Sequence, residues 1–164
     1  MIVLNEPEHA LVRFYDDSFR WIDVKRFAWD GVGEGESVLD SLLNSPHYRD
    51  TYISDDPHLS RSETIHGPYR VAEITPGDFE SISPTAARAV VDEFSNLYQS
   101  PPAPELLQEI ESLVLPRLHG AACYQLRPVE NAEHELAGIL EEFRELVAIS
   151  RVAGEVALIV MAID

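Results

Sequence analysis

The polar segment from Asn44 to Pro68 contains the side chains of this sequence that are best suited to hold a metal ion. Imidazole and carboxylate groups bind zinc, iron or manganese, and a bound ion polarises a substrate and lowers the pKa of a bound water. The candidate ligands are His47, Asp55, Asp56 and His58. Their spacing matches no compact metal-binding motif, and such residues are common in solvated loops. The main interpretation is therefore a metal-free loop, and the alternative is a metal- or small-molecule-binding enzyme.

No other motif identifies a catalytic residue or a cofactor. Ser60 and Ser62 lie near histidines, but neither is in the G-x-S-x-G pattern of a nucleophile elbow. The glycine-rich residues 31–36 lack the lysine of a phosphate-binding loop, and the two glutamates there would repel phosphate. Cys123 lies in a predicted strand rather than at a helix start, where the pKa of its thiol would fall. We therefore assign no catalytic residue and no cofactor, and favour a non-enzymatic protein.

A predicted helix over residues 130–148 carries the strongest candidate binding surface. Its apolar residues follow the spacing of one buried helical face, and glutamates occupy the rest, with Arg144 the only base. A dense negative face attracts a basic partner and speeds its association. The pattern therefore predicts Glu141, Glu142 and Glu145 as partner-binding residues. A solvated face without a partner is the competing interpretation.

The charge of the whole chain favours the same class of partner. The 164 residues include 29 acids and 12 Lys and Arg residues, giving a formal net charge of −17. Such a chain repels phosphate backbones and anionic lipids, so we expect neither nucleic acid nor a membrane surface as a partner. Small acidic proteins without catalytic motifs include the immunity proteins that neutralise nuclease toxins. This analogy of size and charge indicates an acidic, immunity- or antitoxin-like protein that binds a basic protein; no pattern specifies its oligomeric state.

Aromatic residues are concentrated between residues 14 and 29, in a predicted β-hairpin. Its strands are residues 10–15 and 19–24, separated by turn-forming aspartate and serine. The aromatic positions are Phe14, Tyr15, Phe19, Trp21, Phe27 and Trp29. Aromatics across a hairpin usually pair across the strands and form core. The alternative is that they line a ligand pocket beneath the 44–68 loop.

The order of the predicted elements indicates an α+β fold. Strand patterns alternate irregularly with helical patterns, which favours a mixed or antiparallel sheet of about five strands with three to four helices. The apolar run Val156–Ile163 predicts a strand in the middle of this sheet, covered on both faces. We expect one domain over residues 1–164, with the Pro-rich residues 101–104 as an internal hinge.

Compartment signals favour the cytoplasm. Cys123 is the only cysteine, so no intrachain disulfide is possible. The first residues lack the basic region of a secretory signal, and the eight residues of Val156–Ile163 are too few for a membrane span, which needs about twenty. Arginine greatly outnumbers lysine, and Ala, Pro and Val are abundant, a composition typical of a GC-rich bacterial gene.

Overall fold

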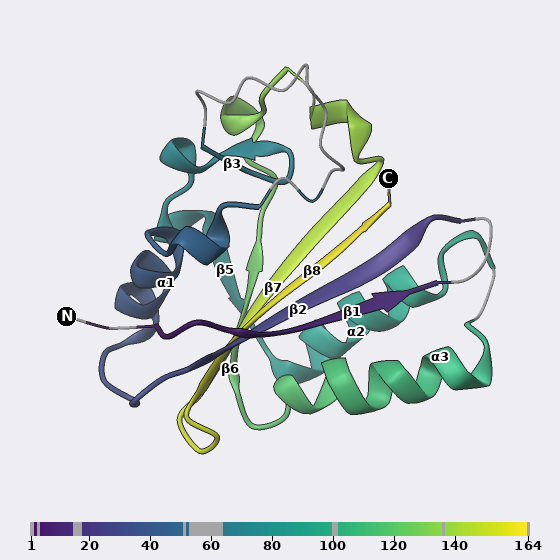
Figure 1. The fold of residues 1–164 in the computed structure, drawn as a ribbon, viewed down its shortest axis with the longest axis horizontal. Coiled ribbons are helices and arrows are strands. Elements are labelled where there is room, and N and C mark those ends of the chain that lie inside the picture. The colour runs from purple at the N-terminus through teal and green to yellow at the C-terminus, as the bar shows by residue number, and fades with distance from the viewer. Residues whose placement is uncertain are drawn as a thin grey trace.

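A six-stranded antiparallel sheet forms the centre of the protein (Figure 1). The computed structural model describes residues 2, 4–14, 18–50, 52, 64–99, 102–135 and 137–163. In spatial order the strands are β1 (Glu8–Arg13), β2 (Arg20–Ala28), β8 (Glu155–Ile163), β7 (Glu142–Ser150), β6 (Ala122–Leu126) and β5 (Phe79–Ile82). Every neighbouring pair in this sheet is antiparallel. The predicted α+β fold class is confirmed.

Helices cover both faces of the sheet (Figure 1). Helix α1 (Gly35–Leu43) packs on one face; α2 (Pro84–Ser95) and α3 (Pro104–Glu109) pack on the other. Helix α3 continues as π-helical turns over Ile110–Val114. A two-stranded ladder of β3 (Ile65–His66) and β4 (Tyr69–Arg70) lies on the side of α1. No helix among the described residues is long and apolar enough to cross a membrane.

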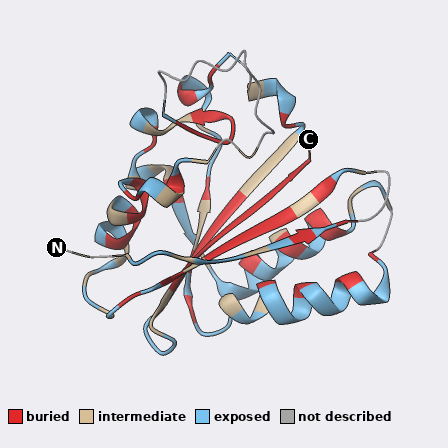
Figure 2. Cartoon of the chain, viewed as in Figure 1, coloured by how far each residue is buried: buried red, intermediate tan, exposed pale blue. Residues whose placement is uncertain are grey.

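The C-terminal strand β8 is the centre of the core, as its unbroken apolar sequence predicts. It pairs with β2 and with β7 along its whole length. Its residues from Val156 to Ile163 are all buried, and Figure 2 shows this buried centre surrounded by helices that are exposed on their outer sides. Burial of both faces at once requires covering layers on each side, which the helices and the described residues Tyr48, Tyr52 and Tyr69 help to supply.

Local signals set the starts of two helical segments. Ser83 caps α2 by accepting a hydrogen bond from the Ala86 N–H at 3.0 Å, and Pro84 occupies the first turn, where a missing N–H has no cost. Thr75 and Asp78 form a capping box around the turn at Pro76–Asp78. Helix α1 starts at Gly35, after Glu34, whose side chain makes no capping hydrogen bond.

The predicted helix over residues 130–148 is wrong. The chain forms short 3-10 turns at Glu130–Ala132 and Ala137–Ile139, and then strand β7 from Glu142 to Ser150. The apolar spacing around Phe143 and Val147 fits a helix, but β8 needs a second neighbouring strand to satisfy its backbone. Pairing with β8 therefore overrides the local helical preference.

Candidate functional site

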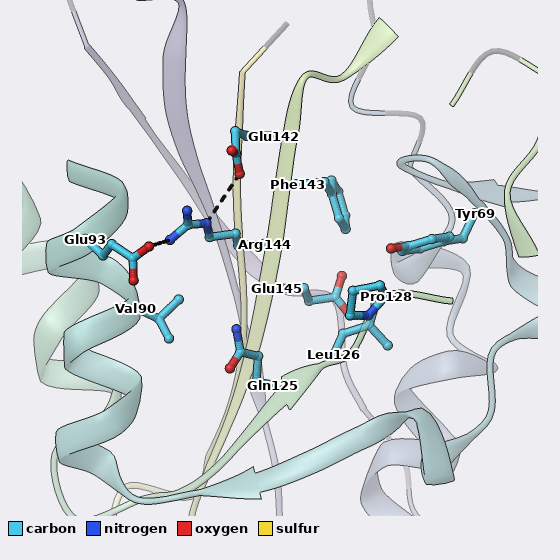
Figure 3. Close-up of a pocket in the computed structure, with 10 residues that line it drawn as sticks. All are labelled: Tyr69, Val90, Glu93, Gln125, Leu126, Pro128, Glu142, Phe143, Arg144 and Glu145. Atoms are coloured by element: carbon cyan, nitrogen blue, oxygen red, sulfur yellow. Dashed lines mark ion pairs between the residues drawn. The ribbon is translucent and has the colours of Figure 1, made fainter. Parts of the chain in front are cut away.

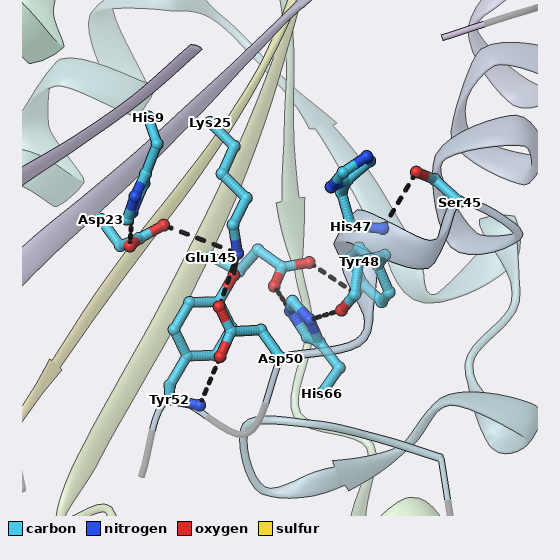
Figure 4. Close-up of polar contacts among 10 residues, drawn as sticks. All are labelled: His9, Asp23, Lys25, Ser45, His47, Tyr48, Asp50, Tyr52, His66 and Glu145. Carbon is cyan, nitrogen blue, oxygen red and sulfur yellow. Dashed lines mark hydrogen bonds and ion pairs between the residues drawn. The ribbon is translucent and has the colours of Figure 1, made fainter. Parts of the chain in front are cut away.

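Three charged side chains project from the sheet on the face that α1 covers (Figure 4). Asp23 of β2 and Glu145 of β7 both lie opposite Val160 of β8, so the three side chains share one face. Lys25 lies two residues further along β2 and points to the same side. All three are buried: 5% of Asp23, 7% of Lys25 and 1% of Glu145 is exposed. Burial of charge is costly unless each group is paired, so their partners determine what the cluster does.

Glu145 is held by two side chains from the segment that crosses this face. The Tyr48 hydroxyl donates to one carboxylate oxygen at 2.8 Å, and Nε2 of His66 contacts the other. The Tyr48 and His66 rings stack with centroids 3.6 Å apart, and Nδ1 of His66 bonds the Tyr48 carbonyl. Burial, followed by the negative charge of Glu145, raises the pKa of the Tyr48 hydroxyl, which therefore remains protonated as a donor.

Lys25 connects the sheet to the same segment at a second point. Its Nζ donates to Asp50 at 2.8 Å and to the Tyr52 hydroxyl at 3.0 Å, and lies 3.8 Å from Asp23. The other Asp23 oxygen bonds His9 of β1. Burial alone raises the pKa of the Asp50 carboxyl, but the hydrogen bond and charge of Lys25 reverse this and lower it overall.

Gly67 allows the segment to turn closely over the sheet. Its φ is +51°, and an added Cβ would overlap the ring of Phe143. Its N–H donates to the Asp50 carbonyl at 2.8 Å, and its carbonyl bonds Nε2 of His134 at 2.7 Å. The hydrogen bonds of the buried cluster thus fix residues 45–50, Tyr52 and residues 64–69 to the sheet.

A groove opens on the other side of Glu145, where β6 separates from β7 (Figure 3). It has a volume of about 420 Å³. Ten residues line it: Tyr69, Val90, Glu93, Gln125, Leu126, Pro128, Glu142, Phe143, Arg144 and Glu145. The groove therefore contains four consecutive residues of β7 and reaches the buried cluster at Glu145.

The groove exists because β6 is shorter than β7. Strand β7 pairs with β8 from Glu142 to Ser150, but with β6 only from Leu146 to Ile149. After Leu126 the chain turns away, since the Arg127 N–H donates to the Asp78 carbonyl and Pro128 has no N–H to offer a ladder. Among the described residues, no strand is paired with Glu142–Glu145 on the side opposite β8.

The groove is negatively charged and partly aromatic. Arg144 pairs with Glu93 of α2 at 3.3 Å and with Glu142 at 3.5 Å, so its one positive charge is shared by two carboxylates. Figure 3 shows these three side chains on one side of β7, and Phe143 with Tyr69 on the other. The Tyr69 and Phe143 rings meet edge to face at 5.9 Å. Carboxylates beside aromatic rings attract a guanidinium or ammonium group.

The three predicted partner-binding glutamates lie near one another in β7 and just before it, but not as one helical surface. Glu141 is exposed and Glu142 is half-buried. Glu142 and Glu145 point to opposite faces because they are three positions apart on a strand. Glu145 is buried and bonded to Tyr48 and His66, so its assignment to an exposed acidic face is wrong.

The metal alternative falls mostly on residues that the structure leaves undescribed. Asp55, Asp56 and His58 lie outside the described residues. His47 is described; its ring packs edge-on against Phe27, with centroids 6.1 Å apart. Among the described residues, no group of three or more His, Cys, Asp or Glu side chains is arranged to hold a metal ion.

The aromatic hairpin lies under the start of the 44–68 segment, and most of its described rings are core. Trp21 stacks with Tyr52 at 5.6 Å, whereas Phe14, Phe27 and Trp29 are buried in the two cores. Phe19 is 67% exposed, and Tyr15 lies outside the described residues. Trp21 of the hairpin therefore supports Tyr52, and the hairpin does not form an aromatic-lined pocket among the described residues.

Several residues that complete the buried cluster and the groove were not predicted from the sequence. Tyr48 and His66 stand in a segment that the sequence pattern predicts to be a solvated loop, and no pattern singles out Glu93. A usable signal was present in β7, where Glu145 directly precedes the apolar stretch from Leu146 to Ile149, at a position that a strand would bury.

Comparisons with known proteins add only a distant structural likeness. No family model and no curated protein matches the sequence. Crystal structures of citrus MAF1 are similar: one has a TM-score of 0.46 at 10% identity, covering 92% of each chain. Another crystal form has a TM-score of 0.41 at 13% identity, covering 92% of this chain and 93% of that chain. Likenesses this weak carry no functional information.

Proposed function

We propose that this chain is a non-enzymatic protein that binds a basic protein partner, and that the groove beside β7 receives a basic side chain of that partner. The observation that carries the proposal is the lining of the groove. Two carboxylates, from Glu93 and Glu142, share the Arg144 guanidinium there, and the buried Glu145 lines the groove beside the rings of Tyr69 and Phe143. A cation entering this groove gains charge attraction and an aromatic surface together.

The use of basic side chains within the fold supports the proposal. Arg20 is buried and donates to the carbonyls of Phe94 and Ser95 at the end of α2, and Lys25 is enclosed by the buried cluster. Arg26 and Arg117 both pair with Glu155. Many acids remain at the surface, including Glu80, Glu105, Glu109, Glu111, Glu135 and Glu141. The charge available to a partner is therefore mainly negative, which favours fast association with a basic surface.

The proposed setting is the cytoplasm, in keeping with the single cysteine. A role of the immunity or antitoxin kind rests on size and charge alone.

A capture experiment with charge-reversed variants tests this function. The protein is immobilised and exposed to host lysate at about 0.05 M and about 0.5 M salt, because surface charge attraction is strongly screened at the higher value. We expect a basic protein to be retained at the lower salt and released at the higher. The double variant Glu93→Lys/Glu142→Lys should no longer retain the basic protein. The control variant Glu105→Lys/Glu109→Lys makes the same charge change on α3 and should still retain most of the basic protein.

Two results would contradict the proposal. If the unaltered protein retains no basic protein at either salt, partner binding of this kind is wrong. If both double variants lose the partner equally, binding depends on overall charge and the groove is not the site. Thermal unfolding of each variant shows beforehand that it folds.

A further inference from the structure

We infer that the partner binds as an extended basic segment that adds a strand to the free edge of β7 at Glu142–Glu145. This inference rests on the proposed function and specifies its mode. Strand addition provides main-chain hydrogen bonds for affinity, and alternating side-chain sites for specificity. Both elements of such a site are present in the groove.

The first element is a stretch of backbone that no described residue pairs with on one side. Residues 142–145 pair with β8 on one side, while on the other side β6 pairs with β7 only over residues 146–149. In an antiparallel strand the N–H and C=O of each residue point to the same side, and successive residues alternate. Two of these four residues therefore direct their backbone groups into the groove. The stretch is about 13 Å long at the usual rise of a strand, enough for about four residues of a partner.

The second element is the alternation of side-chain environments along that edge. A strand lying beside β7 would place every other side chain toward Glu93 and Glu142, on the side of α2. The intervening side chains would face Phe143 and Tyr69, with the Glu145 carboxylate at the base. Basic residues suit the first set of positions by charge, and apolar or basic residues suit the second.

The recessed position of the edge explains how it stays available without indiscriminate pairing. Exposed flat strand edges promote aggregation, and proteins protect them with charged residues or with covering elements. Here α2, through Val90 and Glu93, lies on one side, and Tyr69 with Pro128 lies on the other. Charge also opposes a second copy of this chain as the occupant, because both copies would bring Glu142 to the interface. A basic segment is the complementary occupant.

The test uses synthetic peptides of alternating arginine and valine, titrated against the full chain by calorimetry at low salt. One peptide is unmodified. Two others carry N-methyl groups on alternate backbone nitrogens, one along each edge of the extended peptide, which leaves the charge intact but removes the hydrogen bonds of that edge. We expect N-methylation along the pairing edge to weaken binding about tenfold or more, equivalent to about 1.4 kcal/mol. N-methylation along the opposite edge should change the affinity of the peptide little. Glu93→Lys should also weaken binding, and Glu109→Lys should not.

The outcomes separate the two proposals. If both N-methylated peptides bind as well as the unmodified one, and Glu93→Lys still weakens binding, strand addition is wrong while the basic partner stands. If no arginine-valine peptide binds, but the chain self-associates through a surface that Glu142→Lys disrupts, a second copy is the occupant and the inference is wrong. If no peptide binds and the lysate yields no basic protein, both proposals fail.

Discussion

Two neighbouring rows of the sheet have opposite chemistry. Val24, Ile159 and Leu146 lie side by side on the face covered by α2 and α3, and all are apolar. One position away along each strand, Asp23, Val160 and Glu145 lie on the face covered by α1 and by residues 45–50 and 64–69. The helix-covered face is stabilised by packing, for which many apolar side chains are suitable. The other face depends on specific partners, because an unpaired buried carboxylate is strongly destabilising.

Removal of the Glu145 carboxylate should have the largest effect on stability. Glu145→Ala leaves the Tyr48 hydroxyl and the His66 ring nitrogen buried without this partner, and should lower the free energy of unfolding by about 3–5 kcal/mol. Urea unfolding followed by circular dichroism measures the change. The exposed neighbour serves as control, and Glu141→Ala should alter stability by no more than about 0.5 kcal/mol. Equal effects of the two substitutions would show that the cluster does not stabilise the fold.

A truncation on the apolar face should lower the free energy of unfolding by a similar amount, but without a dependence on pH. Leu146 is fully buried and adjacent to Glu145 in the strand. Leu146→Ala should cost about 2–5 kcal/mol through lost transfer energy and a cavity. Because no ionisable group is altered, the cost should be the same at neutral and at mildly acidic pH. A strong pH dependence would mean that the two faces are coupled.

The close turn at Gly67 gives a third, smaller effect confined to the polar face. Gly67→Ala places a Cβ against Phe143 at a φ that side chains rarely adopt, and should cost about 1–3 kcal/mol. Hydrogen exchange should show faster exchange for the amides of residues 64–69, while α2 remains protected. Uniform destabilisation of both faces would contradict the local account.

The smallest effect concerns Asp50 and depends on pH. Its pKa in the folded protein lies below the unfolded value of about 3.9, so it stabilises the fold above that pH. The contribution is lost as the pH falls through the lower folded value. Since 39% of its side chain is exposed, Asp50→Asn should cost less than about 1 kcal/mol near neutrality. Unfolding in urea at two pH values should show the difference from the unaltered protein disappearing in acid; a difference that grows in acid would contradict this sign.

Sequence patterns predicted the apolar parts of this structure better than the polar ones. The both-faces-apolar stretch Val156–Ile163 identified the central strand, and the turn-forming residues between two strand patterns identified the hairpin of β1 and β2. These signals are local. The groove and the buried cluster are not, because they depend on Tyr48, His66 and Glu93 meeting Glu145 and Arg144 across long sequence separations. The helical misassignment of β7 arose in the same way, since β8 determines its conformation.

Amide hydrogen exchange along β7 tests the free edge most directly. In the peptide-free protein, residues 146–149 lie between β6 and β8 and should be protected without interruption, whereas residues 142–145 should alternate between slow and fast exchange. Addition of the arginine-valine peptide should slow the fast amides of 142–145 and leave those of 146–149 unchanged. Full protection of all four residues before any peptide is added would show that this edge is already covered, and would contradict the binding site proposed for it.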